Sequence, residues 1–279
     1  LDQGYECAGA TMKLYSNEDI GLEKSKTCCS LNDVEDARYV AFKLGIDFHV
    51  FNFSMDFKEK VIDNFIYAYE NGATPNPCIE CNRYLKFERL FEEAENLGCN
   101  HIATGHYARV EKTADGNFVL KKAVEEQKDQ SYFLYSLGQQ TLSRVLFPLG
   151  GYTKAQVREI AEQNGFVNAR KRDSQDICFV PDGDYMAFLQ AYTQKCYPCG
   201  DFLDEQGRVV GKHRGAVAYT IGQRKGLGLA MGAPVYVCGK DMIANTVTVS
   251  SNESLFCREL VADDWNWISI PALTEPLRC

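Results

Sequence analysis

The chain has 279 residues, which is enough for about two domains of roughly 100 to 200 residues each. Hydrophobic residues make up 45% of it and charged residues 24%, as in ordinary globular proteins, and no apolar run is long enough to span a membrane. The net charge of -8 argues against a protein that binds nucleic acid through an overall positive surface.

The first half of the chain predicts strands that alternate with helices. Strand-like segments cover residues 5–14, 46–53 and 99–106, and helical stripes of apolar residues cover 30–45, 56–72 and 82–98. This alternation predicts an α/β fold, a parallel sheet with helices on both faces. Ligands of such folds bind beyond the carboxyl ends of the strands, so the loops that follow the predicted strands are the places to look for a site.

The second half changes character. Residues 136–166 predict helices, with Pro148 between them and a capping box formed by Thr153 and Gln156. Beyond residue 200, short strand-like segments with glycine-rich turns predict a small β-rich module. Basic islands at residues 169–173 and 211–226 interrupt the acidic chain, either as solvated surface charge or as a place for RNA.

Twelve cysteines are present, a number that would allow a disulfide framework. Such frameworks belong to small secreted domains, whereas this chain is long and its first residues show no secretory signal. A reducing, cytoplasmic compartment is therefore predicted, in which clustered cysteines indicate metal or redox chemistry.

The stretch NPCIECN, residues 76–82, places Cys78 and Cys81 just before a predicted helix. The free amide groups of a helix start lower the pKa of a nearby thiol, which favours the thiolate. The pair is compatible with metal binding, with a disulfide cycle, or with a purely structural role. A second pair, Cys196 and Cys199, could complete a zinc site only if the fold brought the two pairs together.

Other candidate residues lie in short polar motifs. Cys178, between Ile177 and Phe179, is predicted to face away from them on a short strand. In ATGHYAR, Gly105 would let a ligand approach the backbone, and His106 could form a hydrogen bond or transfer a proton near neutral pH.

Two further motifs combine charge with turn or helix signals. KDQSYFLY places Lys128, Asp129 and Gln130 before an aromatic helix start. YTIGQRKGLG places Arg224 and Lys225 among glycine turns, which suits contact with a phosphate or a sugar. Each of these motifs alone is a weak signal.

Together and in this order, the motifs resemble those of the tRNA-specific 2-thiouridylases, also called tRNA-uridine 2-sulfurtransferases. The matching strings are TPNPCIECNRYLKF, ATGHYAR, KDQSYFL, DSQDICFVPDGDY and YTIGQRKGLG, and the resemblance covers essentially the whole chain. It implies that ATP and Mg²⁺ adenylate the C2 oxygen of the wobble uridine of tRNA, which sulfur from a cysteine persulfide then replaces. It also implies lysine, glutamate and glutamine tRNAs as partners, with a persulfide donor or a sulfur-relay protein.

The resemblance further implies roles for single residues. Cys81 matches the family's nucleophile and Cys178 its persulfide carrier, while Met12 and Gly105 match nucleotide contacts. The positions that match tRNA contacts are Asn76, Pro77 and Cys78, at the target base, and His106, Lys128, Asp129 and Gln130.

Three parts are implied along the chain. Residues 1–148 match an ATP-pyrophosphatase-type catalytic domain, to whose active site residues 168–190 return. Residues 149–253 match a central tRNA-binding region with the β-rich module, and residues 254–279 match the start of a C-terminal β-barrel. The family's glycine- and serine-rich pyrophosphate loop is not found, and the barrel is short. We therefore expect a fragment that lacks both ends and is inactive by itself.

Three alternatives stay open. One is another ATP-pyrophosphatase-like ligase, such as an amide-forming synthetase, which would not need paired cysteines opposite the nucleotide site. Cys78 stands where some family members have aspartate, so Cys78, Cys81 and Cys178 could instead hold a [4Fe–4S] cluster with one open iron for sulfide. The third alternative is a non-catalytic protein that binds tRNA or a metal.

Overall fold

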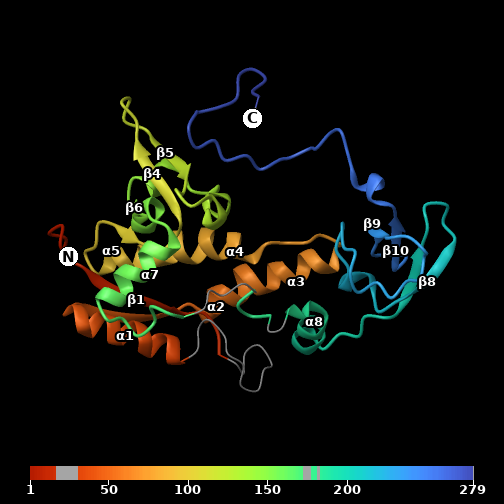
Figure 1. Ribbon diagram of the computed structural model, residues 1–279, viewed down its shortest axis with the longest axis horizontal. Coiled ribbons are helices and arrows are strands. Elements are labelled where there is room, and N and C mark those ends of the chain that lie inside the picture. Colours follow the sequence, from red (N-terminus) through yellow and green to blue (C-terminus); the bar gives the residue numbers. More distant parts are fainter. Residues whose placement is uncertain (17–30, 172–176, 181–182, 279) are drawn as a thin grey trace.

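The computed structural model describes residues 1–16, 31–171, 177–180 and 183–278. Figure 1 shows an elongated molecule with an α/β part at one end and a β-rich module at the other. The last part of the chain passes back over the α/β part, where Asn266 Nδ2 donates to the carbonyl oxygen of Tyr135 and Gln139 Nε2 donates to that of Ile268.

The chain begins with a parallel strand pair joined by a helix. Strand β1 (Ala8–Lys13) pairs with β2 (Asp47–Asn52), in a register that runs from Ala8 opposite Asp47 to Lys13 opposite Asn52. Helix α1 (Leu31–Leu44) connects them and packs on both strands. The predicted order of strand, helix and strand is confirmed.

Two long helical runs follow, and both change type along their length. The first consists of α2 (Ser54–Phe57), the π-helix η1 (Lys58–Ile62) and α3 (Asp63–Glu70). The second consists of α4 (Pro77–Glu80), the π-helix η2 (Cys81–Arg89) and α5 (Leu90–Asn96). The second run starts five residues before the predicted residue 82, because Asn76 caps a turn that begins at Pro77.

A second parallel pair and a hairpin complete the α/β part. Strand β3 (Ile102–Ala103) pairs with β6 (Val145–Leu146), and β4 (Ala108–Lys112) forms an antiparallel hairpin with β5 (Phe118–Lys122). The hairpin was not predicted, although an Asp-Gly dipeptide with Gly116 at φ 91° marks its turn.

The expectation of helices throughout residues 136–166 is correct only in part. The region is preceded by the short turns η3 (Glu126–Lys128) and η4 (Ser131–Leu134). It contains the short α6 (Gln139–Leu142) and η5 (Pro148–Gly151) and the longer α7 (Lys154–Gln163). Strand β6 interrupts this region, and α7 begins at the predicted Thr153–Gln156 capping box. At Gly150 an added Cβ would lie 1.8 Å from the carbonyl oxygen of Ala108, so η5 approaches β4 too closely for any other residue.

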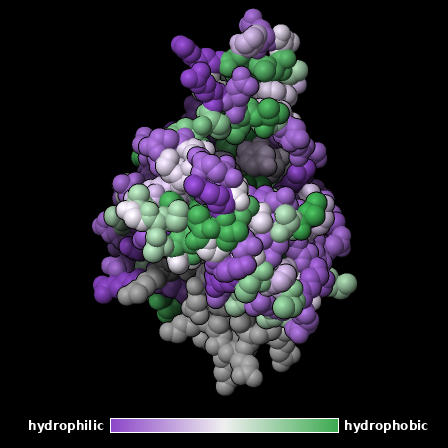
Figure 2. All heavy atoms as spheres, turned by 90° about the vertical axis from the view of Figure 1, so that its right-hand side faces the viewer, coloured by the Kyte–Doolittle hydropathy of each residue, from purple (hydrophilic) through white to green (hydrophobic). Residues whose placement is uncertain are grey.

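Helix α8 (Tyr185–Thr193) leads to the predicted β-rich module, whose strand order is β8-β7-β10-β9. These strands are β7 (Gly200–Leu203), β8 (Val209–His213), β9 (Tyr236–Asp241) and β10 (Thr246–Ser250), with the turns η7 (Ala216–Ala218) and η8 (Asn252–Leu255). The module has its own core around Phe202, Val237 and Val247. Figure 2 shows its outer face, where hydrophilic residues surround small apolar patches.

The core that matters for the site is formed by segments far apart in the sequence. Phe179 packs edge-on against Phe57 and Phe65, with ring centroids 5.6 and 5.2 Å apart, and also contacts Phe188 of α8. Residues 177–180 thereby pack firmly against the α2–α3 run.

Within the described residues, no helix is both long and apolar enough to cross a membrane.

This packing predicts the cost of removing the Phe179 ring. Phe179→Ala should lower the free energy of unfolding by about 3 to 5 kcal/mol, because a fully buried aromatic ring leaves a cavity. The matched control is Phe42→Ala, whose ring on α1 is 82% exposed and should contribute little. Urea denaturation measures both, and equal values would contradict the docking of residues 177–180.

Candidate active site around Cys81 and Cys178

The segment 76–82 is shaped by its cap. The Asn76 side-chain oxygen accepts a hydrogen bond from the Cys78 amide at 3.2 Å, and Pro77 occupies the first helical position. Pro77 is buried, Cys78 is exposed and Cys81 is half-buried. Cys78 therefore faces the solvent, whereas Cys81 packs partly against the protein core.

Cys81 opens the nine-residue π-helix η2. Because a π-helix bonds residue i to residue i+5, residues five apart come to the same side of the helix, which does not happen in an α-helix. Cys81 and Lys86 are such a pair, and π-helical segments are frequently found at functional sites.

The surroundings of Cys81 differ from the sequence expectation. Burial is the largest effect on its thiol and raises the pKa, the positive charge of Lys86 lowers it, and Cys78 raises it further. The net direction is upward, so the expectation of a pKa lowered by the helix start is wrong. Four residues into the helical run, Cys81 no longer lies among the free amide groups.

Cys178 lies in a turn and not on the predicted strand. The amide of Val180 donates to the carbonyl oxygen of Ile177 at 2.9 Å, and the Tyr15 hydroxyl donates to the carbonyl oxygen of Cys178. Cys178 packs against the same core cluster as Cys81 and Met12. The fold thus brings both candidate reactive cysteines and one candidate nucleotide contact to one core.

His106 is buried, with 7% of its surface exposed. Its Nδ1 lies 2.7 Å from Thr104 Oγ1, and its Nε2 lies 3.5 Å from Lys86 Nζ. Burial, with a smaller contribution from the Lys86 charge, lowers the pKa of His106 from 6.5 to about 3. The imidazole is therefore neutral at physiological pH, and the expectation that it transfers a proton near neutrality is wrong.

The segment 128–130 is hydrogen-bonded to the loop that contains His106 and Tyr107. The Gln130 side-chain oxygen accepts from the Tyr107 amide at 3.0 Å, and the Gln130 amide donates to the Tyr107 carbonyl at 2.8 Å. Asp129 accepts from the Ala123 amide at 2.8 Å and from the Ser131 hydroxyl at 2.6 Å. Asp129 and Gln130 therefore order this loop, which in turn sets the position of Lys128.

The two predicted nucleotide contacts differ in exposure. Met12 is half-buried near the end of β1, whereas Gly105 is exposed at the turn after β3. A Cβ added at Gly105 would meet only Leu149 Cδ1, at 3.6 Å, so the protein itself leaves room for a larger residue there. A ligand that approaches the backbone is the kind of constraint that calls for glycine at such an open position.

The described cysteines do not form a metal centre. Among the described residues, no group of three or more histidine, cysteine, aspartate or glutamate side chains is placed to hold a metal ion, and each described cysteine is free of a disulfide. Cys196 and Cys199 are exposed, and no described ligands complete a zinc site with them.

Two residues of η2 were missed by sequence reasoning. Lys86 was missed because an α-helical pattern places it away from Cys81. Asn82 is only 2% exposed, and its Nδ2 donates to the Phe133 carbonyl at 3.3 Å while its Oδ1 has no hydrogen-bond partner among the described residues. An asparagine directly after the candidate nucleophile was the signal that could have drawn attention to it.

Comparisons with known proteins place the chain among tRNA-modifying enzymes. Residues 1–182 match the family model of a tRNA methyl transferase HUP domain, and residues 186–251 match that of a tRNA methyl transferase PRC-barrel domain. The chain is 50% identical over 277 residues to the tRNA-specific 2-thiouridylase MnmA of Clostridioides difficile, an alignment that covers 99% of this chain and 76% of that protein. It is 47% identical to the protein of that name from Symbiobacterium thermophilum (100% of this chain, 73% of the relative) and 48% identical to that from Acetivibrio thermocellus (100% and 78%). The expectation of a fragment that lacks both ends is not borne out by these comparisons, and the expected inactivity stays a prediction.

The neutral His106 predicts a pH dependence of stability. The unfolded chain takes up a proton at this residue below about pH 6.5, whereas the folded chain does so only near pH 3. The contribution of His106 is therefore present above pH 6.5 and is lost as the pH falls, by about 1.4 kcal/mol per pH unit around pH 5. Urea unfolding as a function of pH should show that His106→Gln removes this slope and that the exposed control His101→Gln keeps it. A wild-type slope no steeper than that of His106→Gln would contradict the buried neutral imidazole.

Proposed function

The chain belongs to the tRNA-specific 2-thiouridylase family, and we propose that it uses ATP to replace the C2 oxygen of the wobble uridine of tRNA with sulfur through Cys81 and Cys178. The family indicated by the sequence motifs is confirmed, and with it an enzyme in place of the non-catalytic alternative. The two matching family models carry the name tRNA methyl transferase, but the relatives that match over nearly the whole chain are named thiouridylases. The observation that supports the two roles most directly is the packing of both cysteines against one core cluster.

The chemistry begins with the leaving group. The C2 oxygen of uridine is a poor leaving group, so it first attacks the α-phosphorus of ATP and pyrophosphate departs. The terminal sulfur of a persulfide on Cys178 then bonds to C2, and the C2–O bond breaks as AMP leaves. The Cys81 sulfur attacks the Cys178 sulfur as its proton passes to the departing thiouridine, which frees the thiolated uridine and leaves a Cys81–Cys178 disulfide. A two-electron reductant of the thiol class restores the pair before the next turnover.

The surroundings of each cysteine suit its step. The raised pKa of Cys81 keeps most of its thiol protonated at rest, so the resolving group does not consume the persulfide before the uridine is activated. Burial also limits water around the activated uridine, which would otherwise hydrolyse. The turn at residues 177–180 holds Cys178 through its backbone, which fixes where the persulfide would form.

The tRNA reaches these residues from the exposed side of the site. Asn76, Pro77 and exposed Cys78 would meet the target base, and the loop at Lys128 to Gln130 would meet the neighbouring RNA, with buried His106 supporting that loop through the adjacent Tyr107. The base must leave its stack to reach Cys81, and unstacking costs little free energy for a base in a loop. The acceptors we propose are lysine, glutamate and glutamine tRNAs, in the cytoplasm, with a persulfide protein or a sulfur-relay protein as the donor.

ATP would be held by Met12 and Gly105, with Mg²⁺ carried by its phosphates, since Mg²⁺ is commonly bound through substrate phosphates. The route through a [4Fe–4S] cluster needs three thiolates around one site. The described residues, which include Cys78, Cys81 and Cys178, form no such group of ligands, so the donor set does not fit a cluster and no step is assigned to one.

Substitution of either cysteine should stop sulfur transfer without stopping adenylation of the tRNA. Cys81→Ser and Cys178→Ser should each lower thiolation of tRNA by at least about 1,000-fold, because a hydroxyl neither carries persulfide sulfur nor resolves it. Both should still release pyrophosphate when tRNA and ATP are added. Cys99→Ser, a half-buried cysteine of another core, is the matched control and should keep full thiolation.

Single-turnover assays of pyrophosphate and of thiouridine measure the two steps separately. Thiolation retained in both variants would overturn the mechanism. The same assay on iron-free Cys78→Asp distinguishes the two sulfur routes. Thiolation by this variant would show that no cluster is needed. Thiolation that appears only in iron-loaded protein would favour sulfide delivery from a cluster.

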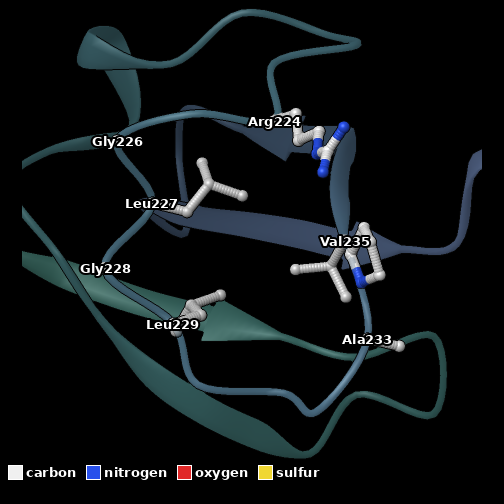
Figure 3. A pocket seen from close by; sticks show the side chains of 8 residues that line it. Arg224, Gly226, Leu227, Gly228, Leu229, Ala233 and Val235 are labelled. Carbon is white, nitrogen blue, oxygen red and sulfur yellow. The ribbon is translucent and has the colours of Figure 1, made fainter.

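A basic surface of the β-rich module extends the proposed RNA contact. Arg224, with residues 226–229 and 233–235, lines an open pocket of ≈ 290 Å³. Figure 3 shows Arg224 at one edge of this pocket, with the side chains of Leu227 and Val235 on opposite sides. Arg224 and Lys225 are exposed, as a phosphate contact requires.

Neutralising this surface should weaken tRNA binding. Arg224→Gln with Lys225→Gln should lower affinity and flatten its dependence on salt, by about 1 to 2 units in the slope of log K against log salt concentration. The control is Arg38→Gln with Lys60→Gln, which removes the same charge from α1 and η1. Filter binding at several salt concentrations measures the slopes, and equal slopes in all three proteins would exclude this surface from the RNA contact.

A further inference from the structure

Lys86 is a cation that is not paired with any carboxylate of the described residues. Its side chain is half-buried on η2, and among the described residues no carboxylate lies within ion-pair distance of it. Its one hydrogen-bond contact is the 3.5 Å approach to His106 Nε2. A half-buried ammonium usually has an anionic partner, because losing water costs free energy that an opposite charge offsets.

The two titratable groups that interact with Lys86, His106 and Cys81, are neutral in the resting protein. His106 carries no charge at physiological pH, and the Cys81 thiol is mostly protonated. Since an ammonium has no acceptor, His106 Nε2 must be the acceptor, and the imidazole hydrogen is then on Nδ1, which donates to Thr104 Oγ1. This hydrogen-bond chain orients the ammonium without neutralising it.

The position of Lys86 relates it to both halves of the reaction. Cys81 lies five residues before it on the same helix, in the register that a π-helix brings together, and the charge of Lys86 acts on its thiol. Lys86 also contacts His106, whose chain neighbour Gly105 is the proposed nucleotide contact. In the adenylated intermediate a single phosphate joins the nucleotide to the uridine, so this phosphate must lie between the nucleotide contact and the cysteine.

We propose that Lys86 binds the phosphate that links the nucleotide to the uridine, and stabilises the charge of AMP as it leaves. When sulfur bonds to C2 and the C2–O bond breaks, the electron pair of that bond stays on the AMP oxygen. A positioned ammonium stabilises this charge more as it develops than in the ground state. The inference rests on the proposed roles of Gly105 and Cys81, and it adds the residue that connects them.

Binding of AMP and of adenosine separates a phosphate contact from a structural role, since the two ligands differ only in the phosphate. Lys86→Met should weaken AMP binding about tenfold, as expected for the loss of one charge-assisted hydrogen bond, and leave adenosine binding unchanged. Lys86→Arg keeps the charge and should stay within about threefold of the wild type. Lys60→Met, the same substitution at a half-buried lysine of η1 that is paired with Glu59, is the control and should change neither affinity.

Isothermal titration calorimetry measures these affinities, and melting curves check that each variant is folded. Equal weakening of AMP and adenosine, or unchanged AMP binding, would overturn the proposal. No tRNA or thiolation is needed, so this result is independent of whether Cys81 and Cys178 perform the sulfur transfer.

A second measurement needs no variant and applies if Lys86→Met does not fold. Reductive methylation of the wild-type protein, mapped by mass spectrometry, should show that saturating AMP protects Lys86 and that adenosine does not, with Lys60 labelled equally throughout. Labelling of Lys86 that AMP leaves unchanged would overturn the proposal.

Discussion

The docking of Phe179 against Phe57 and Phe65 is the contact on which the candidate site depends. Cys178 immediately precedes this ring, so the packing that buries Phe179 also carries the cysteine to the core that Cys81 contacts. Aromatic rings contribute large buried areas and prefer edge-on geometry, so a short turn with a single phenylalanine can be held firmly. A reaction that needs two cysteines from distant parts of the chain thereby depends on ordinary core packing.

The protonation states of Cys81 and His106 follow from their burial in the protein. A thiol and an imidazole are both kept neutral by loss of water, and the ammonium of Lys86 lies close to both. Burial and a positive charge act in the same direction on the imidazole and in opposite directions on the thiol. Among the described residues, no carboxylate pairs with this ammonium, which suits a reaction in which negative charge arrives with the nucleotide.

Most of the fold could be predicted from the sequence, because its signals are local. The parallel pair β1–β2, helix α1 and the capping box of α7 follow from apolar periodicity and capping residues within a few positions. The region 136–166 was less well predicted, because its short turns are held by contacts such as that of Gly150 with β4. The pairing of β3 with β6 likewise joins segments that carry no shared local signal.

For the site, the sequence by itself determined which residue types were present and, through its ordered motifs, the family and reaction to which they belong. Tertiary structure alone decided their chemical state. It buried Cys81 so that its pKa rises, buried His106 so that it stays neutral, and placed Cys178 in a turn. It also brought Lys86 beside Cys81 by forming a π-helix. The physical reason is that desolvation and charge proximity depend on neighbours brought together by the whole fold, whereas motifs and periodicity depend on neighbours along the chain.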